Sequence, residues 1–157
     1  MDRNEILERE RRFRVPVALI TILAVVLFAV QLILLAKKYG GHGNAELLRD
    51  IDKDPSTVVL AYVIRGIGSA LLAVPFYYLF RAAQARSDSV RGQLIGLVIA
   101  GPLFLAGFAV VTGIVLHNAA PDFVSVMKAK HALGTNDHAN SVAQDVIGNQ
   151  SLSGVTA

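Results

Sequence analysis

Three aspartates alternate along one short segment, with the spacing of the first ligands in a helix–loop–helix calcium site. They are Asp50, Asp52 and Asp54. Such a site needs glycine at the sixth loop position, for a sharp turn, and a bidentate glutamate at the twelfth. The sequence has Pro55 and Ala61 at these two positions. The pattern therefore favours a solvated acidic turn in which Asp54 or Ser56 caps the helix that follows.

Four histidines are the obvious candidates for transition-metal ligands, because the chain has no cysteine. They are His42, His117, His131 and His138. Their spacing matches no zinc or copper motif, and Gly134 makes it unfavourable for His131 and His138 to share one helix face. The sequence also lacks a nucleophile elbow, an HExxH pair and a phosphate-binding loop. We therefore expect no metal site, no cofactor and no enzymatic activity.

Arg65 is the one charged residue inside a long apolar stretch, about 12 Å along a helix from Thr57. A charge near the middle of a membrane costs about 2.5–3.5 kcal/mol on insertion scales. The side chain could extend toward the membrane surface or pair with Gln31, the polar residue of another apolar stretch. Alternatively, Arg65 binds an anionic ligand, with Gly68 and Ser69 leaving room beside it.

The elements that carry these residues are three long apolar stretches with charged segments between them. The chain has 157 residues, of which 54% are hydrophobic and only 17% are charged. Each stretch can form a helix that crosses about 30 Å of hydrocarbon. The predicted membrane domain, residues 15–116, contains spans at 15–36, 57–80 and 94–116. The expected fold class is therefore all-α, a helical integral membrane protein with short amphipathic helices outside the membrane.

Prolines and small residues in these stretches predict how the helices bend and pack. Kinks are expected at Pro75 and Pro102, because proline removes one helical hydrogen bond. Small residues four positions apart allow two helix backbones to approach closely. Two such pairs lie in the third stretch, Gly96 with Ala100 and Ala109 with Gly113. We therefore expect contacts with partner helices, either in a second copy or in other membrane subunits.

The segments outside the apolar stretches indicate the orientation of the chain. Basic residues are denser in segments 1–14 and 81–92 than in the connector 37–56 and the tail 117–157. The denser side should be cytoplasmic, so residues 1–14 form a cytoplasmic segment and the tail lies outside the cytoplasm. The net charge of +3 with no basic face argues against a nucleic-acid partner.

Short amphipathic helices are expected in the connector and the tail. In the connector, Leu47, Leu48 and Ile51 share a face that could lie at the membrane interface. In the tail, one helix is expected from Pro121 to Leu133. A second should begin at Asn140, as its cap, and end at Gly148.

The stretch LLAVPFYYLFRAAQAR, residues 71–86, is followed in the next apolar stretch by Gly101 and Pro102. These features resemble a group of uncharacterised multi-pass membrane proteins of actinobacterial type, over roughly residues 15–116. The group has no established activity, so the resemblance implies no site residues. It does imply that further spans follow a polar segment such as 117–150, so the chain could be truncated before another span.

The sequence thus predicts a multi-pass protein of the bacterial inner (plasma) membrane. The expected function is that of a non-enzymatic component that packs with partner helices in the lipid bilayer. The alternative is a subunit of a small-molecule or ion transporter, with Arg65 near a polar cavity lined by the kinks at Pro75 and Pro102. The three stretches contain no acidic residue, which argues against a proton-relay pump built from this chain alone.

Overall fold

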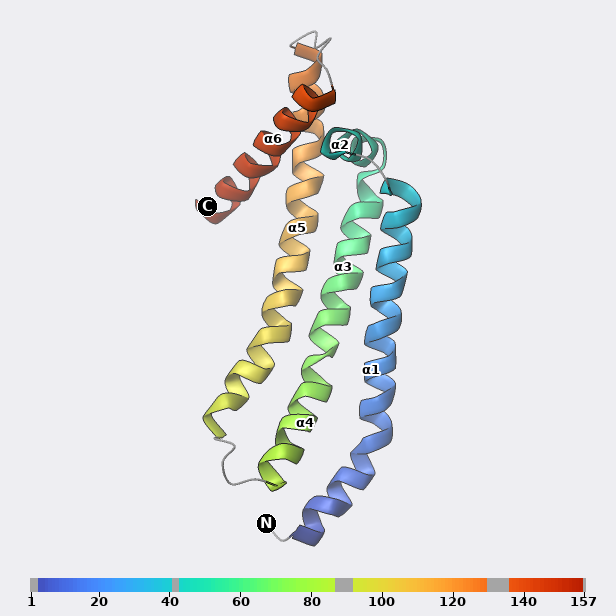
Figure 1. Ribbon diagram of the computed structural model, residues 1–157, viewed down its shortest axis with the longest axis vertical. Coiled ribbons are helices and arrows are strands. Elements are labelled where there is room, and N and C mark those ends of the chain that lie inside the picture. Colours follow the sequence, from blue (N-terminus) through green and yellow to red (C-terminus); the bar gives the residue numbers. More distant parts are fainter. Residues whose placement is uncertain (1–2, 41–42, 87–91, 130–135, 157) are drawn as a thin grey trace. The chain divides into compact units, whose positions relative to one another are not determined.

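The computed structural model describes residues 3–40, 43–86, 92–129 and 136–156, and the elements within these ranges are all helical (Figure 1). The helices are α1 (Arg3–Tyr39), α2 (Asn44–Lys53), α3 (Pro55–Leu71), α4 (Ala73–Arg86), the short 3-10 helix η1 (Gly92–Leu94), α5 (Ile95–Ala129) and α6 (Asn136–Thr156). The all-α fold class is therefore confirmed.

Among the residues that the structure describes, three helical segments are long and apolar enough to cross a membrane. They are Arg11–Lys38, Pro55–Arg86 and Gly92–Lys128. Each contains one of the predicted spans. The second segment combines α3 and α4, and the third continues well beyond residue 116, where the predicted span ends.

The chain forms two compact units. The first unit comprises Met1–Ala29 and Ile64–Phe108, and the second comprises Val30–Val63 and Ala109–Ala157. In the first unit, α1 and α3 pack closely at Gly68. A β-carbon at Gly68 would lie 3.4 Å from the carbonyl oxygen of Ala24 and 3.4 Å from the β-carbon of Leu27. The missing side chain thus lets the two backbones approach, as small residues do at helix contacts.

The break between α3 and α4 lies at Leu72, three residues before Pro75. Proline has no N–H for the Leu71 carbonyl, and its ring crowds that carbonyl, so the helix is disturbed one turn earlier. The N–H of Leu72 instead donates to the Ser69 carbonyl over 3.2 Å, a tighter turn than the α-helix. The interruption expected from Pro75 is therefore present. α5 continues through Pro102, and the bend expected there stays a prediction.

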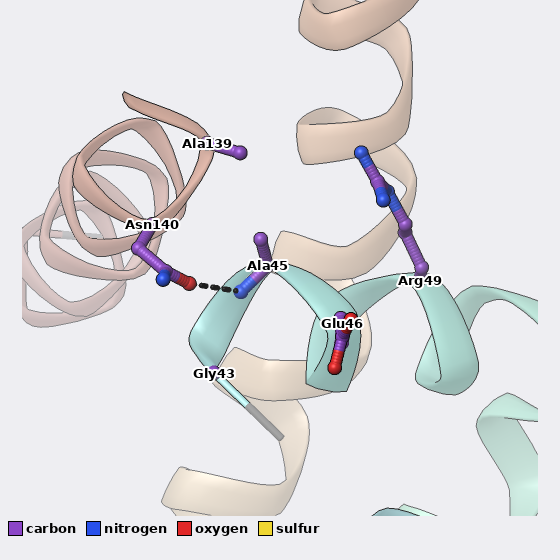
Figure 2. A pocket seen from close by; sticks show the side chains of 6 residues that line it. All are labelled: Gly43, Ala45, Glu46, Arg49, Ala139 and Asn140. Carbon is purple, nitrogen blue, oxygen red and sulfur yellow. Dashed lines mark hydrogen bonds between the residues drawn. The ribbon is translucent and has the colours of Figure 1, made fainter. Parts of the chain in front are cut away.

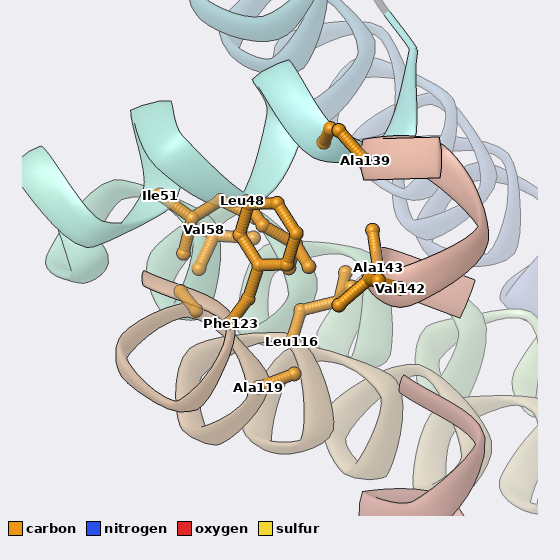
Figure 3. Packing of buried hydrophobic residues seen from close by; sticks show 11 residues of the cluster. Leu48, Ile51, Val58, Leu116, Ala119, Phe123, Ala139, Val142 and Ala143 are labelled. Carbon is orange, nitrogen blue, oxygen red and sulfur yellow. The ribbon is translucent and has the colours of Figure 1, made fainter. Parts of the chain in front are cut away.

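The second unit has a hydrophobic core built from four helices (Figure 3). Its largest fully buried side chains are Phe123 of α5, Leu48 and Ile51 of α2 and Val58 of α3. Smaller residues of α5 and α6 complete the core, including Ala119, Ala120, Ala139 and Ala143. Alanines leave little space between backbones, so Phe123 can reach α2 and fill the centre.

The apolar face of α2 therefore packs inside the second unit and does not face outward as an interfacial helix would, while the position of α2 relative to a membrane stays a prediction. Leu48 and Ile51 are both 0% exposed, and Leu47 packs against the same core while partly buried. An amphipathic helix must bury its apolar face, and here α5 and α6 supply the surface that a lipid interface would otherwise provide.

The helices of the tail differ from those predicted. α5 passes through Pro121 and ends at Ala129, so the separate helix expected from Pro121 is wrong; residues 130–133 lie outside the described ranges. Burial of Phe123 stabilises this extension despite the hydrogen bond that Pro121 removes. α6 begins at Asn136 and runs past Gly148, where open space surrounds the glycine and nothing requires the helix to end.

Candidate functional site

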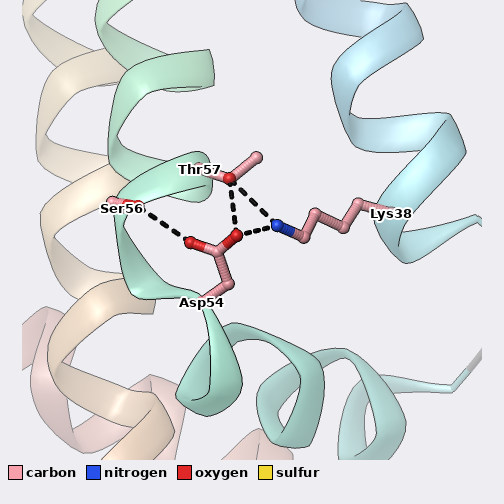
Figure 4. Close-up of polar contacts among 4 residues, drawn as sticks. All are labelled: Lys38, Asp54, Ser56 and Thr57. Atoms are coloured by element: carbon pink, nitrogen blue, oxygen red, sulfur yellow. Dashed lines mark hydrogen bonds and ion pairs between the residues drawn. The ribbon is translucent and has the colours of Figure 1, made fainter.

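The polar residues that the structure brings together most clearly surround the start of α3 (Figure 4). Asp54 precedes the helix, and its carboxylate accepts hydrogen bonds from the hydroxyls of Ser56, at 2.8 Å, and Thr57, at 3.0 Å. Lys38, at the end of α1, forms an ion pair with the same carboxylate and donates to the Thr57 hydroxyl over 3.2 Å. The acidic turn predicted at Asp54 is therefore present, with a lysine partner that the sequence had not indicated.

This arrangement explains the aspartate triplet without a metal ion. Asp50 lies on α2 and pairs with Lys53 over 2.8 Å, Asp52 is exposed on the same helix, and Asp54 pairs with Lys38. Asp50 and Asp54 thus each have an ammonium partner, and Asp54 also accepts from two hydroxyls. Within the described ranges, no group of three histidine, aspartate or glutamate side chains could hold a metal ion.

The histidines do not add a site to the described part of the chain. His117 is exposed on α5. His42 and His131 lie outside the described residues, and so does the side chain of His138. The expectation that the chain holds no metal or cofactor stays a prediction.

A second polar contact lies at the start of α2, beside a pocket of about 110 Å³ (Figure 2). The Ala45 N–H donates to Oδ1 of Asn140, on α6, over 3.0 Å. Gly43, the residue before the helix, supplies no side-chain cap, and a β-carbon there would lie 2.7 Å from the same oxygen. Asn140 thus caps α2 from another helix, and its predicted role as the cap of its own helix is wrong.

The side chains that line the pocket offer few groups that could bind a ligand. Its lining consists of small residues and two charged ones, namely Gly43, Ala45, Glu46, Arg49, Ala139 and Asn140. Glu46 and Arg49 are exposed at its rim, and the Asn140 oxygen is already used by Ala45. The pocket is therefore best explained as the space left where α6 crosses the first turn of α2.

Arg65 lies on the face of α3 that packs against α1. Gly68 and Ser69, three and four residues later, are buried, and Ser69 is only 4% exposed. Arg65 itself is exposed, so its side chain leaves this packed face. Within the described ranges, the structure gives the Arg65 guanidinium no hydrogen bond or ion pair.

Gln31 of α1 is only 3% exposed, although its amide is strongly polar. In the described part of the chain, its side chain makes no hydrogen bond. Gln31 belongs to the second unit and Arg65 to the first, so the pair suggested from the sequence stays a prediction.

The two small-residue pairs of α5 differ in their surroundings. Ala109 is 2% exposed, and a β-carbon at Gly113 would lie 2.6 Å from the β-carbon of Tyr62 on α3. This pair therefore serves packing inside the second unit. By contrast, Gly96 faces open space and Ala100 is exposed, so this pair is available to another helix.

Comparison of the chain with protein-family models, with curated proteins and with solved structures finds no match in any of the three. The resemblance to multi-pass membrane proteins of actinobacterial type therefore stays a prediction from the sequence. The function has to be argued from the helices, the exposed surfaces and the polar contacts described above.

Proposed function

We propose that this chain is a non-enzymatic, integral component of the bacterial plasma membrane that crosses the bilayer three times and packs with partner helices. One observation carries the proposal: large apolar side chains cover the outer surfaces of α1 and α5. Leu19 is 61% exposed, Leu97 72% and Phe104 73%. Soluble proteins rarely expose contiguous apolar surface on this scale, whereas a bilayer requires it.

The internal packing supports this assignment. The core of the second unit lies in its short helices and in the ends of the long ones, around Leu48, Val58 and Phe123. Along the apolar stretches of α1 and α5, many large side chains such as Leu19 and Phe104 are exposed instead. Such an inverted distribution is favourable in hydrocarbon, because lipid tails solvate apolar side chains and every helical backbone group is already hydrogen-bonded.

The surface proposed for a partner helix is the exposed small-residue face of α5. Gly96, Ala100 and Gly107 recur at intervals of four and seven residues, so they lie on one face of the helix. No atom lies within 4 Å of a β-carbon placed at Gly96 or Gly107. A second helix could therefore approach the backbone closely, which is how small residues stabilise contacts between membrane helices.

A single-cysteine experiment tests both parts of the proposal, because the natural chain contains no cysteine to interfere. The Ala100→Cys variant should stay with membranes after an alkaline carbonate wash and should form a disulfide or reagent cross-link with a neighbouring helix. Leu105→Cys, exposed on another face of α5, is the matched control and should cross-link less. Release of the protein by carbonate would refute the membrane assignment, and equal cross-linking of both variants would refute the proposed face.

Orientation follows from the basic residues near the predicted membrane surfaces. We expect α1 to begin in the cytoplasm, because Arg11, Arg12 and Arg14 precede its apolar stretch. In intact cells, a membrane-impermeant thiol reagent should label Ser141→Cys on α6 and should leave Glu8→Cys unlabelled. The reverse pattern would show that the chain has the opposite orientation.

The alternative function is that of a small-molecule or ion transporter subunit, and the exposure of Arg65 favours it. A charged side chain leaving the packed face of a membrane helix needs water, an anion or a partner carboxylate around it. A hydrophilic thiol reagent should label Arg65→Cys if a water-filled path reaches this position. Protection of Arg65→Cys, together with labelling of Ser141→Cys, would argue for contact with lipid or protein and against the transporter.

A further inference from the structure

Five described arginines lie toward one end of the first unit. They are Arg11, Arg12 and Arg14 of α1 and Arg81 and Arg86 of α4. All five are exposed. We call this set the arginine collar, and its position follows from the packing of α1 on α3.

The contact at Gly68 fixes the level of these residues along the unit. Within the first unit, α1 runs antiparallel to α3 and α4 (Figure 1), and Gly68 lies against Ala24 and Leu27. Arg81 lies 13 residues beyond Gly68, and Arg11 lies 13 residues before Ala24. At about 1.5 Å per residue, both positions are about 20 Å from the contact, in the same direction. Arg11 and Arg81 therefore lie at about the same level, with Arg14 nearer the contact and Arg86 farther from it.

The charge balance near the collar differs from that of the second unit. The second unit contains six lysines and arginines and seven acidic residues, and two of its lysines form ion pairs, Lys38 with Asp54 and Lys53 with Asp50. The first unit contains nine arginines and five acidic residues, so its net charge is positive. The collar therefore presents a net positive surface immediately beside apolar helices.

An exposed aromatic residue, of a type that favours membrane surfaces, lies beside the collar. Tyr77 is 43% exposed and lies one helical turn before Arg81 on α4. Tyrosine favours the headgroup region, where its ring contacts acyl chains and its hydroxyl contacts water. Arginine binds phosphate oxygens through its planar guanidinium, often with two hydrogen bonds.

We infer that the arginine collar binds the phosphate groups of anionic phospholipids in the leaflet that faces residues 11–14. This inference rests on the proposed membrane function and adds the chemistry of the lipid partner. Each arginine near an anionic surface contributes about 1 kcal/mol, which corresponds to about a fivefold change in affinity. The collar should therefore prefer phosphatidylglycerol to phosphatidylcholine, and salt should weaken the preference.

The test uses the full chain reconstituted in vesicles of phosphatidylcholine alone and in an equal mixture with phosphatidylglycerol. The association of each lipid with the protein is measured with spin-labelled analogues. One variant replaces Arg11, Arg12 and Arg14 by glutamine, and another replaces Arg81 and Arg86. The matched control replaces Lys37 and Arg49, which are exposed in the second unit. Arginine-to-lysine versions of both collar variants keep the charge.

We expect the natural chain to enrich phosphatidylglycerol, and each glutamine variant to lose up to about fivefold of that preference per arginine removed. The lysine versions should retain most of the preference, and the control should retain all of it. The inference is overturned if the natural chain enters both kinds of vesicle without preferring either lipid, or if the control loses as much as the collar variants. Failure to enter either kind of vesicle would instead overturn the membrane function on which the inference rests.

Discussion

Asn140 accepts a hydrogen bond from the backbone N–H of Ala45 over 3.0 Å, although 95 positions of the sequence separate the two residues. The first backbone N–H groups of any helix lack partners within the helix, and α2 begins after a glycine that offers no side chain. This one hydrogen bond therefore stabilises the start of α2 and also joins α2 to α6.

Replacing Asn140 by alanine should lower the free energy of unfolding by about 0.5–2 kcal/mol, the usual cost of losing a cap. Aspartate at this position should retain most of the stability, because its carboxylate also accepts from Ala45. Thermal or denaturant unfolding of the detergent-solubilised protein measures the change. Asn149→Ala, an exposed asparagine on the same helix, is the control. Equal losses for the two alanine variants would contradict the assigned role of Asn140.

Gly113 should tolerate no larger residue. In Gly113→Ala, the new β-carbon would lie 2.6 Å from the β-carbon of Tyr62, which cannot move away by rotating its side chain. Overpacking of this kind costs about 1–3 kcal/mol. Gly107→Ala, on the same helix with open space around it, should leave stability unchanged or raise it. Unfolding curves for the two variants should therefore separate, and coincident curves would argue against the contact with Tyr62.

Phe123 should contribute far more to stability than another phenylalanine of α5. Phe123 is 0% exposed and Phe104 is 73% exposed. Phe123→Ala should cost about 3–5 kcal/mol, because it removes a buried ring and leaves a cavity. Phe104→Ala should change the free energy of unfolding in detergent by less than about 1 kcal/mol. Comparable losses would mean that the core around Leu48 and Phe123 does not hold the second unit together.

Asp54 should matter more than its lysine partner. Asp54→Ala removes acceptors for Ser56, Thr57 and Lys38 together and should cost about 1–2 kcal/mol. Lys38→Gln removes one ion pair whose two side chains are 41% and 33% exposed, so it should cost less than about 1 kcal/mol. Lys37→Gln, next to it and exposed, is the control. A larger loss for Lys38→Gln than for Asp54→Ala would reverse the assigned roles.

The predictions that held were those that depend on local sequence alone. Uninterrupted apolar stretches predict long helices because hydropathy and length are local properties, and Pro75 predicts a break because its ring acts on the preceding turn. The acidic turn at Asp54 likewise involves Ser56 and Thr57, its near neighbours, while a cap on the backbone of α3 stays a prediction. In each case the sequence contains both partners of the interaction within one or two turns.

The predictions that failed depend on contacts between distant segments. The apolar face of α2 has the same spacing whether it meets lipid or Phe123, so periodicity could not distinguish the two. Gly96 with Ala100 and Ala109 with Gly113 share one spacing, yet only the second pair packs inside the protein. Asn140 follows the usual pattern of a local cap, and only the folded position of α6 places it against Ala45.

Because Asn140 lies far after Ala45 in the sequence, α2 is synthesised well before the residue that caps it. A ribosome adds about 5–20 residues per second, so about 5–20 s pass before the residue that caps α2 exists. Phe123, the centre of the core, also emerges well after Leu48 and Ile51. If the chain enters a bilayer as proposed, the apolar face of α2 can rest at the boundary between headgroups and acyl chains during those seconds. The interfacial position expected from the sequence would then belong to α2 in the nascent chain. When α6 is made and packs against α2, the apolar face of α2 becomes part of the core.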